Sequence, residues 1–328
     1  MSKIKIFIFA VTLAFSCAIF TCFVSHGLTF GRHGESVENQ LAILKGEPGC
    51  YDGGKYYLSM FQNRILFPSL LNALKNMGFL STSQWYIVLR IISSFLAFFV
   101  FFYLLIKIGQ VNYKIASAAV VLLAYEMIFT FNFPWENPTD FLDVTFISSF
   151  LWAALSHRRL VLFLLAILAA TNRKSSSFAG VIWFFLYGID NKFRLRLLDF
   201  FYAVFISIIS YGFALLIRHN YGVAGIRNQQ SFTAWSDLSS CIKKFINHPN
   251  HISWPVLLLA MSIPIVLWIW NNRKFLSPRG VRLLASALAI FLITLIFGTI
   301  KEIRVFIPTI VIMVFVAAVA ESKNSYVN

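Results

Sequence analysis

Residues 85–106 read WYIVLRIISSFLAFFVFFYLLI, a stretch in which Arg90 is the only charged side chain. An α-helix needs about 20 apolar residues to cross the hydrocarbon core of a bilayer. Over the whole chain, 59% of the residues are hydrophobic and 12% are charged, a composition that excludes a water-soluble domain. The apolar runs are continuous, whereas strands of a transmembrane barrel alternate between apolar and polar residues. The sequence therefore predicts an all-α, polytopic membrane protein that forms one transmembrane domain over residues 1–328.

Ten apolar segments are expected to form transmembrane helices. The fourth to sixth segments are short, so their boundaries are approximate. The alternative that one of these three is re-entrant, and does not cross the membrane, stays open. The first segment begins like a signal peptide, but it is too long and has no small-x-small cleavage site, so it is expected to stay as the first helix. The ten expected helices lie near residues 6–24, 85–106, 115–133, 142–156, 159–172, 177–189, 198–217, 253–270, 282–299 and 304–320.

Basic residues predict the orientation in the membrane. Short loops on one side of the ten segments are rich in Lys and Arg, which is typical of cytoplasmic loops. Both termini are therefore expected in the cytoplasm, and the formal net charge of +15 needs no nucleic-acid partner. The basic residues on this side are Lys3, Lys5, Lys107, Lys114, Arg158, Arg159, Lys192, Arg194, Arg196, Arg273, Lys274, Arg279, Arg282 and Lys323.

The extracytoplasmic side is expected to carry most of the acidic residues. Only Asp190, Asp199 and Glu321 fall on the cytoplasmic side. The outer side comprises two long loops and three tight turns, which are residues 25–84, residues 218–252, FPWENPTDFLD (133–143), TNRKSSS (171–177) and GTIKEIRVF (298–306).

These outer turns predict a charged cavity. Ionisable groups at membrane depth are costly unless they face protein or water, so by default they mark a functional site. The alternative is that the turns are merely solvated. Asp143, Glu126 and Arg90 lie inside apolar stretches that solvation alone does not reach, which favours the cavity.

The long first loop is expected to contain amphipathic helices. From Glu35 to Lys45, the residues Val37, Leu41 and Leu44 form one apolar stripe, with Glu35, Glu38 and Lys45 on roughly the opposite face. Such a helix would lie on the membrane with its carboxylates turned toward the cavity. A second amphipathic piece is expected around residues 64–75, broken near Pro68.

The combination of outer carboxylates and outer cations favours transfer of a group from a phosphate to a hydroxyl. A carboxylate can take the proton of the acceptor, and Arg or Lys can neutralise the departing phosphate. The chain has no Gly-rich phosphate loop, so a donor within the lipid phase fits better than a soluble nucleotide. The outer cations are Arg64, Arg173, Lys174, Lys301 and Arg304.

At this point the chain resembles the GT-C superfamily of polyprenyl-phosphate-sugar glycosyltransferases, in a small bacterial form. The pattern ESVENQLAILKGEPGCYDGGKYY (35–57), followed by RILFPSLL (64–71), is similar to the loop after the first span in that superfamily. FPWENPTDFLD resembles its second acidic loop, and TNRKSS resembles its Asn-Arg turn. The resemblance implies Glu35 as the catalytic base. Gly34 stands where the family has the first acid of a pair, so Glu38 and Asp52 stay open as the base.

Several predicted site residues have a structural alternative. Asp140 is either a site residue or the N-cap of the fourth helix, while Asp143 is expected to hold an acceptor hydroxyl or a metal. Arg173 and Lys174 either bind the donor phosphate or anchor the turn at the interface. Glu302 and Arg304 are either site residues or a local ion pair. The remaining predicted substrate-binding residues are Asp52, Arg64 and Glu136.

The sequence thus predicts a membrane glycosyltransferase of the bacterial inner membrane, acting in cell-surface polysaccharide synthesis. Its expected partners are membrane lipids, a polyprenyl-phosphate-linked sugar donor and an extracytoplasmic glycan or lipid-linked acceptor, and a divalent cation (Mg or Mn) is a candidate cofactor. A glycan polymerase or ligase and a lipid-linked oligosaccharide transporter or flippase are the alternatives. Charges near the bilayer midplane and inverted repeats are typical of transporters, and the sequence shows neither. Cys50 and Cys241 fall in outer loops, where a disulfide can form.

Overall fold

The structure is a computed structural model that describes residues 3–29, 41, 44, 64–129, 138–190, 194–221, 253–297 and 306–325. Within these ranges the chain is helical, and its only strand-like pairing is an isolated bridge between Ile189 and Leu195. The helices are α1 (Lys3–Thr29), α3 (Leu66–Lys75), α4 (Thr82–Lys107), α5 (Tyr113–Phe129), α6 (Pro138–Leu155), α7 (Arg159–Ala170), the 3₁₀ helix η2 (Lys174–Ser177), α8 (Phe178–Trp183), the π-helix η3 (Phe184–Gly188), α9 (Leu197–Tyr221), α11 (Ser253–Asn271), the 3₁₀ helix η5 (Arg273–Phe275), α12 (Pro278–Phe297) and α13 (Ile307–Asn324).

The all-α class is confirmed, and each of the ten expected segments has a helical counterpart. Among the described residues, four helices are long and apolar enough to cross a membrane. They are Ile4–Val24, Thr82–Lys107, Leu197–Ile217 and Ile307–Asn324.

The structure refines one expected helix and corrects one expected break. The segment 177–189 is helical, but α8 gives way after Trp183 to the π-helix η3. Pro68 does not break the amphipathic piece, because it lies in the first turn of α3, where the backbone N–H groups have no partner within the helix. In the first loop, Leu41 and Leu44 are helical, and Leu41 packs against the core.

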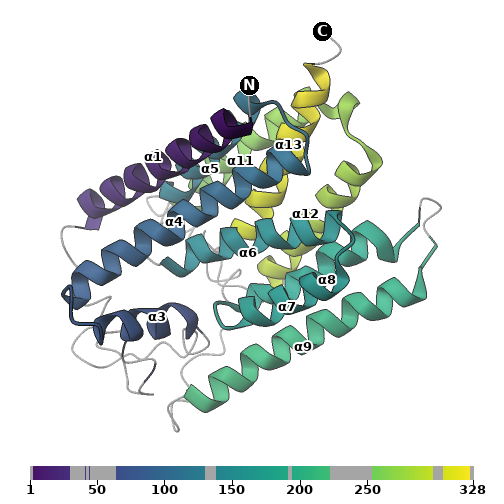
Figure 1. Ribbon diagram of the computed structural model, residues 1–328. Helices are drawn as coiled ribbons and strands as arrows, with labels where there is room; N and C mark the ends of the chain where they lie inside the picture. The colour runs from purple at the N-terminus through teal and green to yellow at the C-terminus, as the bar shows by residue number, and fades with distance from the viewer. Residues whose placement is uncertain are drawn as a thin grey trace, which may run out of the picture.

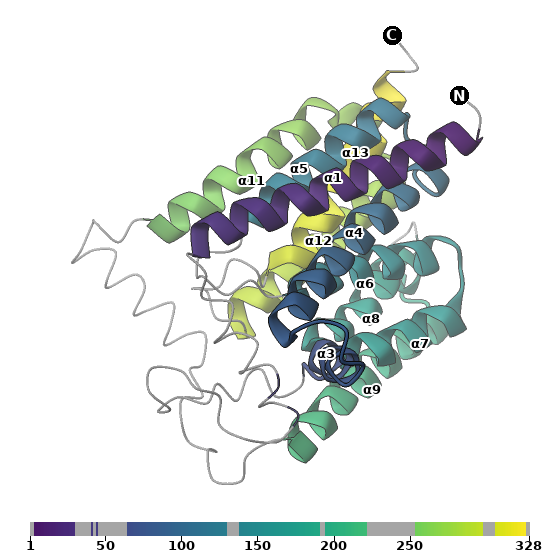
Figure 2. The ribbon, with the colours of Figure 1, turned by 60° about the vertical axis from the view of Figure 1, so that its left-hand side comes forward.

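The centre of the bundle is formed by α6 and α13. No side chain of α6 is exposed, and the last turn of α13 carries the only exposed side chain of that helix, Lys323. By contrast, α1 and α9 lie at the periphery, and Figures 1 and 2 show them on opposite sides of the bundle. Their outward apolar side chains, such as Phe23 and Leu198, are exposed, as expected for helices that face lipid.

The bundle has two ends, at which different turns gather. At the N/C end, where α1 begins and α13 ends (Figure 1), the amide of Asn112 donates to Ser322 Oγ at 3.2 Å. There the Tyr187 hydroxyl also donates to the carbonyl of Ala154 at 2.7 Å. At the α3 end, the amides of Ile65 and Leu66 both donate to the carbonyl of Thr171, at 2.9 and 3.1 Å. The two sets of turns are those that the sequence assigns to opposite faces of the membrane.

Candidate functional site

Asp140 and Asp143 lie near the start of α6, at the α3 end of the bundle. Helix α6 begins at Pro138, which suits a first turn because its missing N–H would have no partner there. A spacing of three residues places both acids on one side of the helix. Asp140 is fully buried and Asp143 is 3% exposed, so both carboxylates need partners within the protein.

Arg173 supplies the opposite charge. It follows the end of α7 in extended conformation, and only 8% of it is exposed. Its guanidinium Nη1 lies 3.0 Å from Asp140 Oδ1 and 3.3 Å from Asp143 Oδ2. The Ser175 hydroxyl donates to the other oxygen of Asp143 at 2.5 Å. We call Asp140, Asp143, Arg173 and Ser175 the Asp–Arg cluster.

Hydrogen bonds hold the turn that carries Arg173 against α6. The Asn172 side-chain amide donates to the carbonyl of Thr139 at 2.9 Å, and Arg64 Nη1 donates to Thr139 Oγ1 at 3.4 Å. With the two amides that bond to Thr171, these contacts bring the start of α3, the start of α6 and the end of α7 together. Three segments that are distant in the sequence thus fix the geometry of the cluster.

The cluster holds two buried carboxylates and one guanidinium, and the buried Arg64 beside it adds a second positive charge. One guanidinium is in contact with two carboxylates, and charge interactions are stronger in such a water-poor environment than at the surface. Next to it, Asn172 Oδ1 and Ser176 Oγ are buried without a hydrogen-bond partner in the described part of the chain. The site therefore combines fixed charges with polar groups that still have hydrogen-bonding capacity.

Of the predicted site residues, the structure brings four together, which are Arg64, Asp140, Asp143 and Arg173. Lys174 is directed elsewhere, because its Nζ lies over the ring of Tyr211 on α9, 6.0 Å from the ring centre. Six predicted site residues lie outside the described residues, as do Cys50 and Cys241. These six are Glu35, Glu38, Asp52, Glu136, Glu302 and Arg304.

The interpretation of Asp140 as a helix N-cap is wrong. An N-cap residue precedes the first helical residue, whereas α6 begins two residues before Asp140. An acid in the first turn is still favoured by the helix dipole, so its position also supports the helix. Its contact with Arg173 shows that the side chain turns into the protein.

Sequence reasoning missed Ser175, Asn172 and Thr139 as parts of the site. Small polar residues are common in turns for local reasons, so their type alone does not show which of them points inward. The available signal was the position of TNRKSSS between two short apolar segments, which identified the turn but not its individual contacts.

A divalent cation does not fit the cluster well as it is arranged. Arg173 already occupies the position between the two carboxylates that a cation would take. Within the described ranges, no group of three His, Cys, Asp or Glu side chains is placed to hold a metal ion. The predicted cation stays a prediction, and we derive no catalytic step from it.

Comparison with known proteins adds no relative. No protein-family model, no curated protein and no solved structure matches this chain.

Proposed function

We propose that the protein is an integral-membrane glycosyltransferase with about ten transmembrane helices. It transfers a sugar from a polyprenyl-phosphate donor to an extracytoplasmic glycan or lipid-linked acceptor. In this proposal the N/C end faces the cytoplasm of a bacterial cell and the α3 end faces outward. The observation that carries the proposal is the buried Asp–Arg cluster, because charges at that depth have a cost that a purely structural turn avoids.

The chemistry requires a base on the acceptor side and positive charge on the donor side. The acceptor hydroxyl oxygen attacks the anomeric carbon while the bond from that carbon to the phosphate oxygen breaks. The proton of the hydroxyl passes to a carboxylate, and the phosphate leaves with the bonding electron pair. Attack opposite the leaving group inverts the anomeric carbon.

The roles of the individual residues follow from the contacts. Glu35 is the proposed base, as the resemblance implies, and Asp140 or Asp143 holds the acceptor hydroxyl. Arg173 keeps these two acids in place and compensates their charge. Lys174, the second predicted ligand of the donor phosphate, has its Nζ over the ring of Tyr211 and would have to turn away from that ring to reach a phosphate at the cluster.

A transfer assay tests the proposal. Membranes that contain the protein are supplied with a polyprenyl-phosphate hexose labelled in its sugar, and the label that leaves the carrier is measured. Removal of a general base lowers a rate by about 10²- to 10⁴-fold, so Glu35→Gln is expected to abolish most transfer. Asp140→Asn or Asp143→Asn, whichever acid holds the acceptor hydroxyl, is expected to lower transfer. Asp190→Asn, the same change at the N/C end, is the control and should retain full transfer.

Three outcomes would correct or contradict the proposal. Glu35→Gln with full activity would move the base to Glu38 or Asp52, whereas full activity in Asp143→Asn and Asp140→Asn together would remove the cluster from catalysis. A wild-type protein that moves the labelled lipid across the membrane with its sugar still attached would be a transporter instead.

A further inference from the structure

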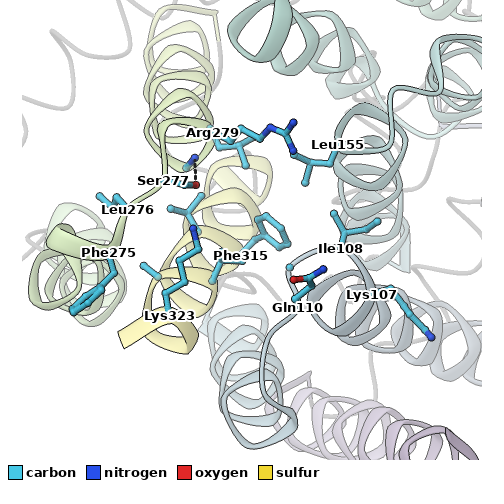
Figure 3. A pocket seen from close by; sticks show the side chains of 16 residues that line it. Lys107, Ile108, Gln110, Leu155, Phe275, Leu276, Ser277, Arg279, Phe315 and Lys323 are labelled. Carbon is cyan, nitrogen blue, oxygen red and sulfur yellow. Dashed lines mark hydrogen bonds between the residues drawn. The ribbon is translucent and has the colours of Figure 1, made fainter. Parts of the chain in front are cut away.

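A pocket of about 480 Å³ opens at the N/C end, far from the Asp–Arg cluster. It lies between the turn after α4, the end of α6, the start of α12 and the end of α13 (Figure 3). Gly109 allows this arrangement, because a side-chain carbon there would lie 3.0 Å from Val319 of α13 and 2.8 Å from the carbonyl of Leu105. The pocket is thus built by the packing of four separate helices.

The rim of the pocket is positively charged. Of the side chains that line it, three are basic, namely Lys107, Arg279 and Lys323, and among the described residues lining it none is acidic. In Figure 3, Arg279 and Lys323 reach along two sides of the opening, while Lys107 extends away from it. The pocket also begins at the N-terminus of α12, whose helix dipole adds partial positive charge.

The floor of the pocket is apolar. Phe315, Val316 and Val319 of α13 form one wall, and Leu283 and Leu155 come from α12 and α6. A small hydrated anion gains nothing from such a floor, whereas an amphiphile with a charged head and an apolar tail contacts both surfaces. The apolar helices around the pocket place it where a membrane leaflet would end.

We infer that this pocket binds the phosphate headgroup of an anionic membrane lipid, with Arg279 and Lys323 as the residues that contact the phosphate. Guanidinium and ammonium groups form charge-assisted hydrogen bonds with phosphate oxygens, and basic pockets between membrane helices bind lipid headgroups in this way. The lipid chains then lie along the apolar floor. This inference is independent of the proposed transferase activity.

The positive-inside pattern alone does not account for the pocket. That pattern requires only that loops on one side be basic, and it is satisfied by exposed cations in any position, such as Lys114 and Lys274. Arg279 and Lys323 differ from these two because they flank one cavity from two different helices. The two pairs therefore provide a matched comparison with the same change of net charge.

The experiment uses the purified full-length protein in a neutral detergent, titrated with dioctanoyl phosphatidic acid while its melting temperature is followed. Dioctanoylglycerol, which lacks the phosphate, and inorganic phosphate, which lacks the chains, are the two control probes. Wild-type protein is expected to be stabilised saturably by phosphatidic acid and by neither control. Arg279→Gln/Lys323→Gln is expected to weaken the apparent Kd by about tenfold or more, as for the loss of charge-assisted hydrogen bonds.

The matched pair Lys114→Gln/Lys274→Gln is expected to weaken the apparent Kd by less than about threefold, because it changes only the screened surface potential. Equal weakening in both pairs would show a general surface effect and overturn the inference. Equal stabilisation by dioctanoylglycerol would show an apolar pocket without phosphate recognition. Equal stabilisation by inorganic phosphate would show a free-anion site. Each of these results excludes the lipid headgroup as the ligand.

Discussion

The two ends of the bundle treat charge in opposite ways. At the α3 end, the acids Asp140 and Asp143 are buried and share Arg173. At the N/C end, the cations Arg279 and Lys323 are exposed around an open pocket. Buried, compensated charges have a fixed geometry, which suits a reaction, whereas exposed charges of one sign suit the capture of a mobile anion. The charged residues of this chain therefore form two different kinds of site, the buried Asp–Arg cluster at the α3 end and an exposed basic pocket at the N/C end.

The largest expected effect concerns the sidedness of the two ends. Reporter fusions after residues 110 and 276, at the N/C end, are expected to give a cytoplasmic signal, because the loops there are basic and short. Fusions after residues 50 and 235, in the two long loops that are expected on the extracytoplasmic side, should give an extracytoplasmic signal. Each fusion reports either a cytoplasmic or an extracytoplasmic position, so the reporter signals from the two ends are expected to differ almost completely.

A fusion after Met77, in the turn between α3 and α4, gives an independent control at the α3 end. A cytoplasmic signal at this position or at residue 50 would place both sites on the same side. The contrast between an outer reaction site and an inner lipid pocket would then be lost.

The next largest effect is expected from Arg173→Gln. Removal of one partner from a buried ion pair leaves uncompensated charge and typically costs about 3–5 kcal/mol of stability. Here two carboxylates would lose their shared cation, so the free energy of unfolding in detergent is expected to fall by at least that amount. Chemical unfolding of the purified protein measures it.

A compensating variant shows whether charge is the cause. Arg173→Gln combined with Asp140→Asn and Asp143→Asn removes the three charges of the cluster and leaves only the buried Arg64 beside it, and it is expected to recover part of the lost stability because the three residues are coupled. If the combined variant is as unstable as the sum of the separate changes, the contacts are energetically independent and the cluster is not a charge-compensated unit.

Most of the fold could be predicted from the sequence because long apolar segments have few alternatives to a membrane helix. Helices such as α4 and α9 follow directly from their composition, and their ends lie within a few residues of the expected positions. The irregular segment at α8 and η3 could not be predicted. The close approach of Gly180 in α8 to Ala203 and Ser207 of α9 was not predictable either, because it joins two separate helices.

The Asp–Arg cluster was predictable only in part, for the same reason. The acids of FPWENPTDFLD and the cations of TNRKSSS were identifiable because ionisable residues are rare in apolar surroundings. The pairing between them was not identifiable, since it depends on how α6 and α7 pack. Arg173 was therefore expected to meet a phosphate, whereas the structure places it on two carboxylates.

A smaller effect is expected at Gly180, where α8 closely approaches α9. A side-chain carbon at Gly180 would overlap with the carbonyl oxygen of Ala203 and the hydroxyl of Ser207 on α9. Gly180→Ala is therefore expected to cost about 1–3 kcal/mol through overpacking. Gly212→Ala on α9 is the matched control, because nothing lies within 4 Å of the added carbon.

The control also has an expected sign. In a helix interior alanine is more favourable than glycine by about 1 kcal/mol of helix stability. Gly212→Ala should therefore leave the stability of the protein unchanged or raise it slightly. The measurement is thermal unfolding of both variants in the same detergent. Equal stability of the two variants would mean that α8 and α9 can separate without cost.

The smallest effect is expected from the ion pair at the N/C end that most resembles the cluster. Arg159 lies 2.8 Å from Asp199, and the Arg159 side chain is 56% exposed whereas that of Asp199 is 12% exposed. When Arg159 is replaced, Asp199 still accepts a hydrogen bond from Trp183 Nε1 at 3.1 Å. Ion pairs at the surface contribute about 1 kcal/mol or less, and here water and salt reach the pair through the exposed Arg159 guanidinium. Arg159→Gln is therefore expected to reduce the free energy of unfolding by no more than about 1 kcal/mol, and by less as salt is added.

Arg173→Gln should show little dependence on salt, since its pairs are buried. A loss at Arg159 as large as that at Arg173 would mean that burial does not separate the two ends, and the contrast drawn from their charges would fail.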